Sequence, residues 1–208
     1  MPKKKATPSK PAPKPRHAPP VRRKNAESRE RGEYLTPAEL AQLCAAAASI
    51  GRHQDRDSTM IFIAYRHALR VSELTELKWD AVEFKVPRVW VSRKKGSNSG
   101  HHPLAKDELK ALKVLAPKEE YRVGYVFKNE RGGKLTESCV RKLVARAGKL
   151  AGFPFHVHPH QLRHACGHTM ANKKIPTGII QHWLGHVNAQ HTSRYAVIDD
   201  ETLRGIWE

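Results

Sequence analysis

Residues 158–172 read HPHQLRHACGHTMAN, and this stretch decides both the fold and the chemistry of the chain. Pro159 ends the preceding extended segment, so we expect a helix from about residue 160 to residue 172. His160 and Arg163 then lie one turn apart on one face of that helix. The N–H groups and partial positive charge of the helix N-terminus favour an anion beside them. The alternative is a histidine and an arginine on a solvated surface.

The sequence LGH at residues 184–186 extends this set toward the C-terminus. Gly185 is expected to end the helix before it, because glycine commonly follows a helix C-terminus. His186 is then placed to donate a hydrogen bond to a phosphate oxygen, with a packing role as the alternative. Tyr195 follows nine residues later among polar neighbours, so we expect it to face the surface as a possible nucleophile. The other tyrosines are Tyr34, Tyr65, Tyr121 and Tyr125, of which Tyr65 is expected in the core.

Two further cationic groups lie upstream. Arg70 is expected where an apolar helix meets the next one, and Glu73 could steady its guanidinium while the fork grips two phosphate oxygens. A structural ion pair is the alternative. Lys95 lies at the tip of a predicted hairpin, where a flexible amine could protonate a departing alkoxide. Lys94 is its neighbouring competitor, and either lysine could simply be solvated.

These groups together suit chemistry on a phosphodiester. A phosphate in transfer carries charge on its non-bridging oxygens, so fixed positive donors and a placed nucleophile matter more than a metal. A tyrosine nucleophile would conserve the phosphodiester energy in a phosphotyrosyl ester, so a strand could be rejoined without ATP.

The composition points to a polyanionic partner. The net charge is +18 and the pI is about 10.1, which favours nucleic acid over an anionic membrane surface. No apolar run is long enough for a membrane helix, and the basic first residues without an apolar stretch lead us to expect no secretion. Three widely spaced cysteines read as reduced thiols, so we expect a cytoplasmic protein. No membrane partner is expected.

The N-terminus is a basic arm. Residues 1–24 hold nine Lys and Arg, seven Pro and no Asp or Glu, which predicts disorder, and we extend this arm to residue 33. It could tether DNA non-specifically or serve only as a solubilising leader. The predicted DNA contacts are Lys3, Lys4, Lys5, Arg22, Arg23 and Lys24 in the arm and Arg93 beside the hairpin.

Residues 34–208 are expected to form one domain. Thr36-Pro37-Ala38-Glu39 predicts a capping box and a helix to about residue 50. A second helix should cover residues 60–70 and a third should start at residue 72. Alternation at residues 82–91 and a return strand from residue 102 predict a small antiparallel sheet. Further helices are expected at 105–115, 136–151, 160–172, 176–184, 190–196 and 199–206. The fold class is therefore mainly α with a small antiparallel β-sheet.

The density of histidines raises a zinc alternative. His160, His164 and His168 would share one helix face, but the spacing of His164, Cys166 and His168 does not match the usual zinc fingers. No metal site and no cofactor are therefore expected.

Taken together, these motifs resemble the catalytic domain of the tyrosine recombinases, the phage integrase family. The resemblance covers about residues 34–208 and is nearest to the short fimbrial phase-switch recombinases. It is carried by MIFIAYRH at residues 60–67, HPHQLRHACG at residues 158–167 and GIWE at residues 205–208. A gapless match from Arg70 to Leu104 places the family lysine on Lys95.

The resemblance implies a mechanism. Tyr195 would attack the scissile phosphate to give a 3′-phosphotyrosyl link and a free 5′-hydroxyl, without metal or nucleotide. Arg70, His160, Arg163 and His186 would stabilise the phosphate, Lys95 would protonate the leaving oxygen, and His160 could also accept the phenol proton. The family acts as a tetramer on paired double-stranded DNA sites. Leu203, Ile206 and Trp207 could form a tail that docks on a neighbouring protomer or packs in cis.

The separate N-terminal core-binding domain of most members is not expected here, so accessory DNA-bending proteins are anticipated. The preferred function is inversion of a promoter-bearing segment in phase variation. The alternatives are a recombinase-derived regulator that binds DNA without cutting, integration or excision of a mobile element, and a topoisomerase-like relaxing enzyme.

Overall fold

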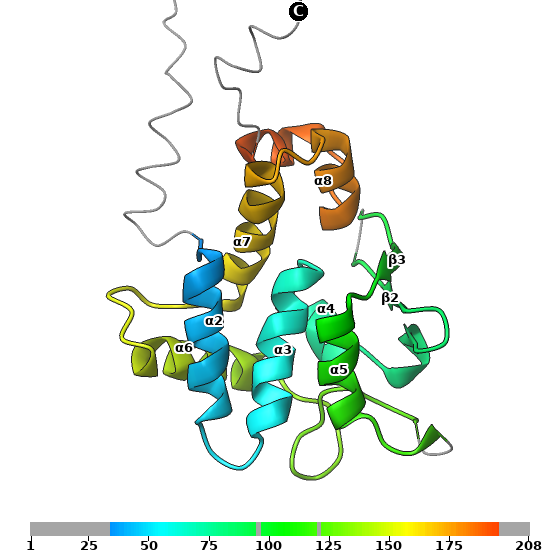
Figure 1. Cartoon of the computed structure of the whole chain (residues 1–208), viewed down its shortest axis with the longest axis vertical. Helices are drawn as coiled ribbons and strands as arrows, with labels where there is room; N and C mark the ends of the chain where they lie inside the picture. The colour runs from blue at the N-terminus through cyan, green and yellow to red at the C-terminus, as the bar shows by residue number, and fades with distance from the viewer. Residues whose placement is uncertain (1–33, 95–96, 120–121, 196–208) are drawn as a thin grey trace, which may run out of the picture.

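The computed structural model describes residues 34–94, 97–119 and 122–195. Its helices are α2 (Pro37–Ala48), α3 (Gln54–Arg66), α4 (Val71–Glu76), α5 (Lys106–Leu115), α6 (Glu137–Leu150), α7 (Pro159–Asn172) and α8 (Thr177–Leu184). The strands are β1 (Val82–Glu83), β2 (Arg88–Val91) and β3 (Gly100–Pro103), and short 3-10 turns are η1 (Trp79–Ala81), η3 (Ala189–His191) and η4 (Ser193–Tyr195). The predicted class, mainly helical with one small antiparallel sheet, is confirmed (Figure 1). Among the described residues, no helix qualifies as a membrane span.

The capping box predicted at the start of α2 is present. The Thr36 hydroxyl accepts a hydrogen bond from the Glu39 N–H at 3.2 Å, and the Glu39 carboxylate accepts one from the Thr36 N–H at 2.7 Å. Pro37 occupies the first helical position, where its missing N–H costs nothing. Leu40 and Leu43 are buried on the face that packs against α3 and α6.

α3 is the central helix of the fold. It packs against α2, α5 and α7, and Figure 1 shows it in cyan between α2 and α5. Met60, Ile61 and Ile63 are each 1% exposed. The helix starts earlier than predicted, at Gln54, because its first turn is polar and gives no apolar periodicity. Asp55 and Asp57 in that turn stabilise the helix N-terminus electrostatically.

α3 ends in a turn that glycine usually makes. Ala68 has a φ of +50°, in the left-handed region that costs a residue with a Cβ about 1–2 kcal/mol. The N–H of Ala68 donates to the Tyr65 carbonyl at 3.1 Å, and that of Leu69 donates to the Ala64 carbonyl at 2.9 Å. These two bonds form a Schellman motif. The turn ends α3 four residues before the predicted residue 70 and leads directly into α4.

The three strands pair in the order β1-β2-β3, antiparallel throughout. Val89 pairs with Val82 on one side and with His102 on the other. Val89 and Val91 point into the core, at 2% exposure each, while Trp90 between them is 41% exposed. This alternation is the period of two that predicted the sheet. β3 begins at Gly100, two residues before the predicted start.

The segment after α8 differs from the prediction. The helix expected over residues 190–196 is replaced by the two short turns η3 and η4. The Thr192 carbonyl accepts a hydrogen bond from the Tyr195 N–H at 2.9 Å, which is the three-residue spacing of a 3-10 turn. The expected helix at residues 199–206 and the tail residues Leu203, Ile206 and Trp207 lie outside the described residues.

Gly148 provides a test of how tightly α6 packs against the segment before α7. A Cβ at Gly148 would lie 2.7 Å from the Cβ of Val157, which is buried. We expect Gly148→Ala to lower the free energy of unfolding by about 1–3 kcal/mol, although alanine is the better helix former. Gly178→Ala in α8, where no atom lies within 4 Å of the new Cβ, should leave stability unchanged or raise it by up to about 1 kcal/mol. Urea denaturation of both variants measures this, and equal midpoints would contradict the packing argument.

Candidate active site

Several helix ends bring the predicted catalytic residues together. Arg70 is the N-cap of α4, Arg163 lies in the first turns of α7, and His186 follows the C-terminal end of α8. Gly185 has a φ of +67°, and the His186 N–H donates to the Gln181 carbonyl at 2.9 Å. The prediction that Gly185 ends α8 is therefore confirmed.

Arg70 is held by Glu73, as the sequence suggested. Its Nη1 donates to one Glu73 carboxylate oxygen at 2.7 Å, and its backbone N–H donates to the other at 2.9 Å. The Arg70 Nη2 also donates to the hydroxyl of Ser97 at 3.2 Å. The Arg70 side chain is still 35% exposed, so its guanidinium can also meet an anion from solvent.

Arg163 is buried, and backbone carbonyls orient its guanidinium. Nη1 donates to the Ala68 carbonyl and Nη2 to the Leu184 carbonyl, both at 2.6 Å. Burial, followed by the charges of Arg93 and Arg70, lowers the pKa of Arg163 to about 10. At neutral pH the guanidinium remains charged. Arg163 thus joins the turn after α3 to the end of α8.

The two predicted histidines lie in different surroundings. His160 is exposed in the first turn of α7, and its ring meets the His164 ring edge to face at 4.4 Å. His186 is half-buried, and its Nδ1 lies 2.9 Å from the hydroxyl of Thr192. Thr192 also binds the backbone of Tyr195, so one buried threonine links the position of His186 to that of Tyr195.

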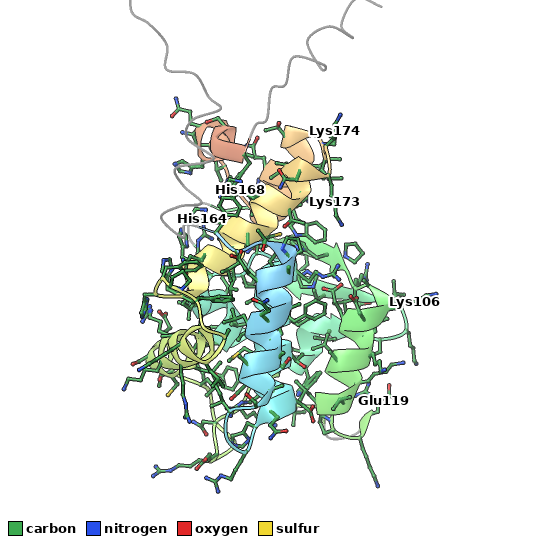
Figure 2. The ribbon with its side chains drawn as sticks, turned by 60° about the vertical axis from the view of Figure 1, so that its left-hand side comes forward. Lys106, Glu119, His164, His168, Lys173 and Lys174 are labelled. Carbon is green, nitrogen blue, oxygen red and sulfur yellow. The ribbon has the colours of Figure 1, made fainter. Side chains whose placement is uncertain are left out.

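Tyr195 is not on the surface, so that prediction is wrong. The residue is 2% exposed, and its hydroxyl lies 2.8 Å from Nδ1 of His164. Its ring packs against Gly167 and stands edge on to His168 at 5.1 Å. Figure 2 shows His164 and His168 along α7. The physical reason is Gly167, which has no Cβ and leaves room for the ring.

Arg93 also lies elsewhere than predicted. Its side chain is 1% exposed and forms an ion pair with Glu73 at 2.8 Å, so in this structure it does not present the surface contact that was predicted for DNA. The remaining hydrogen bonds of its guanidinium go to backbone carbonyls of the end of α3 and of α8. A basic residue beside a hairpin normally faces solvent, and here four inward-facing acceptors bury it instead.

Of the predicted lysines and the basic arm, the structure describes only Lys94. Lys95 lies outside the described residues, as do Lys3, Lys4, Lys5, Arg22, Arg23 and Lys24. Lys94 is exposed, and its charge helps to lower the pKa of Glu76 after the hydrogen bond from Lys134 and the charge of Lys134. The choice between Lys94 and Lys95 therefore stays a prediction.

Sequence reasoning missed four residues around the site. Arg93 was not expected to be a buried hydrogen-bond donor, and His164, Gly167 and Thr192 were not expected around Tyr195. A glycine inside a helical pattern does signal close approach of another group, so Gly167 could have been found. The other three carry no local signal. Across residues 34–94, 97–119 and 122–195, no three His, Cys, Asp or Glu side chains gather closely enough to hold a metal ion.

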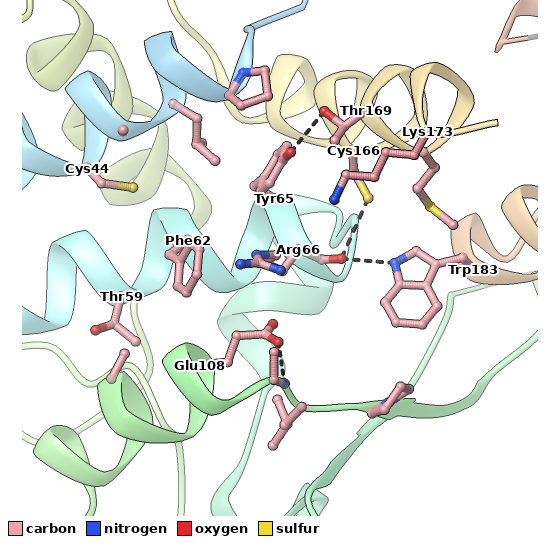
Figure 3. Close-up of a pocket in the computed structure, with 18 of the residues that line it drawn as sticks. Cys44, Thr59, Phe62, Tyr65, Arg66, Glu108, Cys166, Thr169, Lys173 and Trp183 are labelled. Carbon is pink, nitrogen blue, oxygen red and sulfur yellow. Dashed lines mark hydrogen bonds between the residues drawn. The ribbon is translucent and has the colours of Figure 1, made fainter. Parts of the chain in front are cut away.

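A large cavity opens beside the site, between α2, α3, α5, α7 and α8. Its volume is about 910 Å³, and mostly apolar side chains line it, among them Leu40, Phe62 and Met170 (Figure 3). At its rim the Trp183 indole N–H donates to the Arg66 carbonyl at 2.9 Å. This bond fixes α8 to the end of α3, next to the carbonyls that hold Arg93 and Arg163.

Three comparisons bear on this geometry. The model of the phage integrase family matches residues 33–202. The type 1 fimbriae regulatory protein FimE of Escherichia coli K12 is 35% identical over 180 residues, which is 84% of this chain and 90% of FimE. FimB of the same strain is 32% identical over 189 residues, 89% of this chain and 94% of FimB.

Solved structures agree on the fold. The crystal structure of XerA recombinase has a TM-score of 0.68 and 26% identity, covering 84% of this chain and 63% of that chain. XerH recombinase bound to its difH substrate has a TM-score of 0.65 at 22% identity, covering 85% of this chain and 53% of that one. The chain therefore spans between half and two thirds of these solved proteins.

Gly167 offers a test of how Tyr195 is held. An added Cβ would lie 2.7 Å from Cζ of Tyr195, so we expect Gly167→Ala to displace the ring from α7 while the helix itself persists. Nitration of Tyr195 by tetranitromethane, followed by peptide mass spectrometry, should become several-fold faster. Gly178→Ala should nitrate like the wild type, and an unchanged rate in Gly167→Ala would contradict the packing described for Tyr195.

His102 lies beneath the site and makes stability depend on pH. Burial lowers its pKa to about 3, helped by the charges of His67, Arg93 and His182, and its ring lies 4.0 Å from that of Trp183. The unfolded chain takes up this proton near the ordinary value of 6.5, so His102 lowers the free energy of unfolding as pH falls from about 6.5 toward 3. In His102→Phe the loss of stability between pH 7 and pH 4 should be smaller in urea denaturation. Parallel curves for the two proteins would contradict this.

Proposed function

The chain belongs to the phage integrase family and is a tyrosine-type site-specific recombinase, and on this premise we propose that Tyr195 cuts and rejoins DNA through a 3′-phosphotyrosyl intermediate. The observation that carries the proposal is the shared anchoring of Arg70 and Arg163 beside the buried tyrosine. Arg70 pairs with Glu73 and Arg163 donates to the Ala68 carbonyl, while Tyr195 is bonded through His164 to α7, the helix that carries Arg163.

The reaction follows from this arrangement. Oη of Tyr195 forms a bond to phosphorus, the bond from phosphorus to the 5′ oxygen breaks, and the phenol proton passes to an imidazole beside it. His164 is bonded to the phenol in the buried position, and His160 takes the proton once Tyr195 has moved. Lys95 protonates the departing 5′ oxygen, with Lys94 as the competitor for this role. The reverse attack by a 5′-hydroxyl rejoins the strand and needs no ATP, metal or cofactor.

The charged groups act on the phosphate. Arg70 presents an exposed guanidinium steadied by Glu73, and Arg163 adds a second fixed charge next to it. Preorganised donors of this kind stabilise the charge that develops on the non-bridging oxygens without any reorganisation cost. His160 and His186 complete the set of donors around the phosphate.

Tyr195 has to move before it reacts. At 2% exposure its hydroxyl cannot meet a phosphate from solvent, so the segment from η3 to η4 shifts when DNA binds. Because the His186 ring is bonded to Thr192, that shift also repositions His186. DNA binding is thereby coupled to assembly of the site.

The partner is double-stranded DNA, and the biological outcome is inversion of a promoter-bearing segment in phase variation. Similarity to two fimbriae regulatory proteins over at least 90% of their length supports this choice over integration or excision of a mobile element. The chain acts as a homotetramer on paired sites, with accessory DNA-bending proteins, in the bacterial cytoplasm at the nucleoid. Contacts from Lys3, Lys4, Lys5, Arg22, Arg23 and Lys24 in the arm add salt-dependent affinity.

The second candidate is a regulator that binds DNA without cutting it. The burial of Tyr195 in the free protein is the observation that favours it. A regulator of this kind would control transcription by occupancy alone, and it would have no use for the phenol hydroxyl.

Tyr195→Phe separates the two candidates. Wild type and variant are expressed in a host that lacks recombinases and carries the native locus, and the population is sequenced with long reads. We expect new DNA junctions with the wild type and none with Tyr195→Phe, because the nucleophile is gone while DNA occupancy stays equal. Tyr125→Phe, away from the site, should recombine like the wild type. Equal occupancy with no junctions from any of the three proteins would favour the regulator.

A further inference from the structure

Arg93 occupies the centre of the site without reaching its surface. Nη1 donates to the Ala68 carbonyl at 3.1 Å and to Glu73 at 2.8 Å, and Nη2 donates to the carbonyls of His67 at 3.0 Å and Trp183 at 2.7 Å. The four acceptors belong to three separate segments: the end of α3, the first turn of α4 and the end of α8. One planar guanidinium therefore fixes these segments relative to one another.

The acceptors of Arg93 are shared with the two arginines proposed to bind phosphate. Glu73 accepts from Arg93 and from Arg70, and the Ala68 carbonyl accepts from Arg93 and from Arg163. Arg163 also binds the Leu184 carbonyl, next to the Trp183 carbonyl that Arg93 binds. A displacement of Arg93 would consequently move both cationic groups.

The charges reinforce this arrangement. Burial alone would raise the pKa of Glu73, but the charge of Arg93, followed by the hydrogen bonds from Arg70 and Arg93, brings that pKa below its usual range. The carboxylate is therefore ionised when it orients Arg70. Without Arg93, Glu73 would be a buried carboxylate with Arg70 as its remaining charged partner, which is strongly unfavourable.

The sequence LGH makes room for the Arg93 side chain. A Cβ at Gly185 would lie 3.0 Å from Nε of Arg93 and 3.1 Å from its Cγ. Gly185 thus does more than end α8, because its missing Cβ also leaves room for the Arg93 side chain. The backbone N–H of Arg93 donates to the Ser99 hydroxyl at 2.9 Å, which ties the same residue to the return of the hairpin.

We propose that Arg93 is a positioning residue for DNA cleavage, which sets the spacing between Arg70 and Arg163 without touching the scissile phosphate. The proposal rests on the proposed recombinase function. It predicts that the loss of Arg93 slows the chemical step, while the affinity for DNA is nearly unchanged.

The test uses the full chain and a nicked DNA substrate, built on the junction sequence found at the native locus, that traps the covalent intermediate. Arg93→Met and Arg93→Lys are compared with the wild type in single-turnover cleavage at saturating DNA, and DNA affinity is measured separately. Arg56→Met is the matched control, because Arg56 also pairs with a carboxylate, Asp57 at 2.6 Å, and with a carbonyl, that of Lys128 at 2.8 Å, near the other end of α3. All rates are taken below the melting temperature of each variant.

We expect Arg93→Met to form the covalent complex about 100-fold more slowly than the wild type, with the dissociation constant changed by less than about threefold, since small misplacements of charged groups cost this much. Arg93→Lys should remain slow, because a single ammonium cannot serve four acceptors in the plane of a guanidinium. Arg56→Met should lower the melting temperature and leave the cleavage rate within threefold. Cleavage by Arg93→Met within threefold of the wild type would overturn the proposal.

A second comparison covers the case in which Arg93→Met does not fold. Glu73→Gln combined with Arg93→Met removes both buried charges, which restores folding where the unpaired carboxylate was the problem. The double variant should cleave at least tenfold more slowly than Glu73→Gln alone, since the carbonyls of residues 67, 68 and 183 have lost their common donor. Equal rates would overturn the proposal. Failure of the wild type itself to form a covalent complex would instead sink the proposed function, so the two failures are distinguishable.

Discussion

The carbonyl of Ala68 is the acceptor on which the rest of the site depends. It receives hydrogen bonds from Arg163 at 2.6 Å and from Arg93 at 3.1 Å, and it is available because the Schellman turn ends α3 at that point. The left-handed conformation of Ala68 is unfavourable for a residue with a Cβ by about 1–2 kcal/mol. Two buried guanidinium groups left without this acceptor would cost more, because an unsatisfied bond to a charged group costs at least as much for each donor. The turn and the arginines therefore stabilise one another.

This dependence explains why the site holds its charges together in the absence of DNA. Arg70 and Arg93 share the buried carboxylate of Glu73, and Arg163 adds a third positive charge held by backbone carbonyls, so the cluster keeps an excess of positive charge. Backbone carbonyls of His67, Ala68, Trp183 and Leu184 supply the remaining negative partial charge. Carbonyl dipoles orient a guanidinium without neutralising it, whereas further carboxylates would cancel the field that a phosphate needs.

Sequence patterns correctly predicted the structural features that depend on residues close together in the chain. The capping box at Thr36, the helix end at Gly185 and the alternation through Val89 and Val91 are local signals, and each appears where expected. The prediction of a helix near residue 190 was wrong, because hydrogen bonds of the 3-10 type, between residues three apart, replace the α-helical ones there. The predicted exposure of Arg93 and Tyr195 was wrong for a different reason. Whether they are buried depends on the acceptors at residues 67, 68 and 183 and on the missing Cβ of Gly167, and these come from distant parts of the chain. Lys95 and the basic arm remain predictions from the sequence.

The excess of positive charge in this cluster could favour both the binding of a phosphate and the release of Tyr195 from α7. Burial is the main cause that lowers the pKa of Arg163 to about 10, and the charges of Arg93 and Arg70 act in the same direction because like charges repel one another. On the proposed function, a phosphodiester bound between Arg70 and Arg163 would relieve that repulsion, so DNA binding would stabilise the cluster. Leaving α7 would cost Tyr195 its 2.8 Å hydrogen bond to His164 and its packing on Gly167. Those interactions are worth a few kcal/mol at most. Relief of repulsion between buried charges in a low-dielectric site is of the same order. In the proposed mechanism, the uncompensated charge that attracts the phosphate would thus also provide the free energy that releases Tyr195 to attack it.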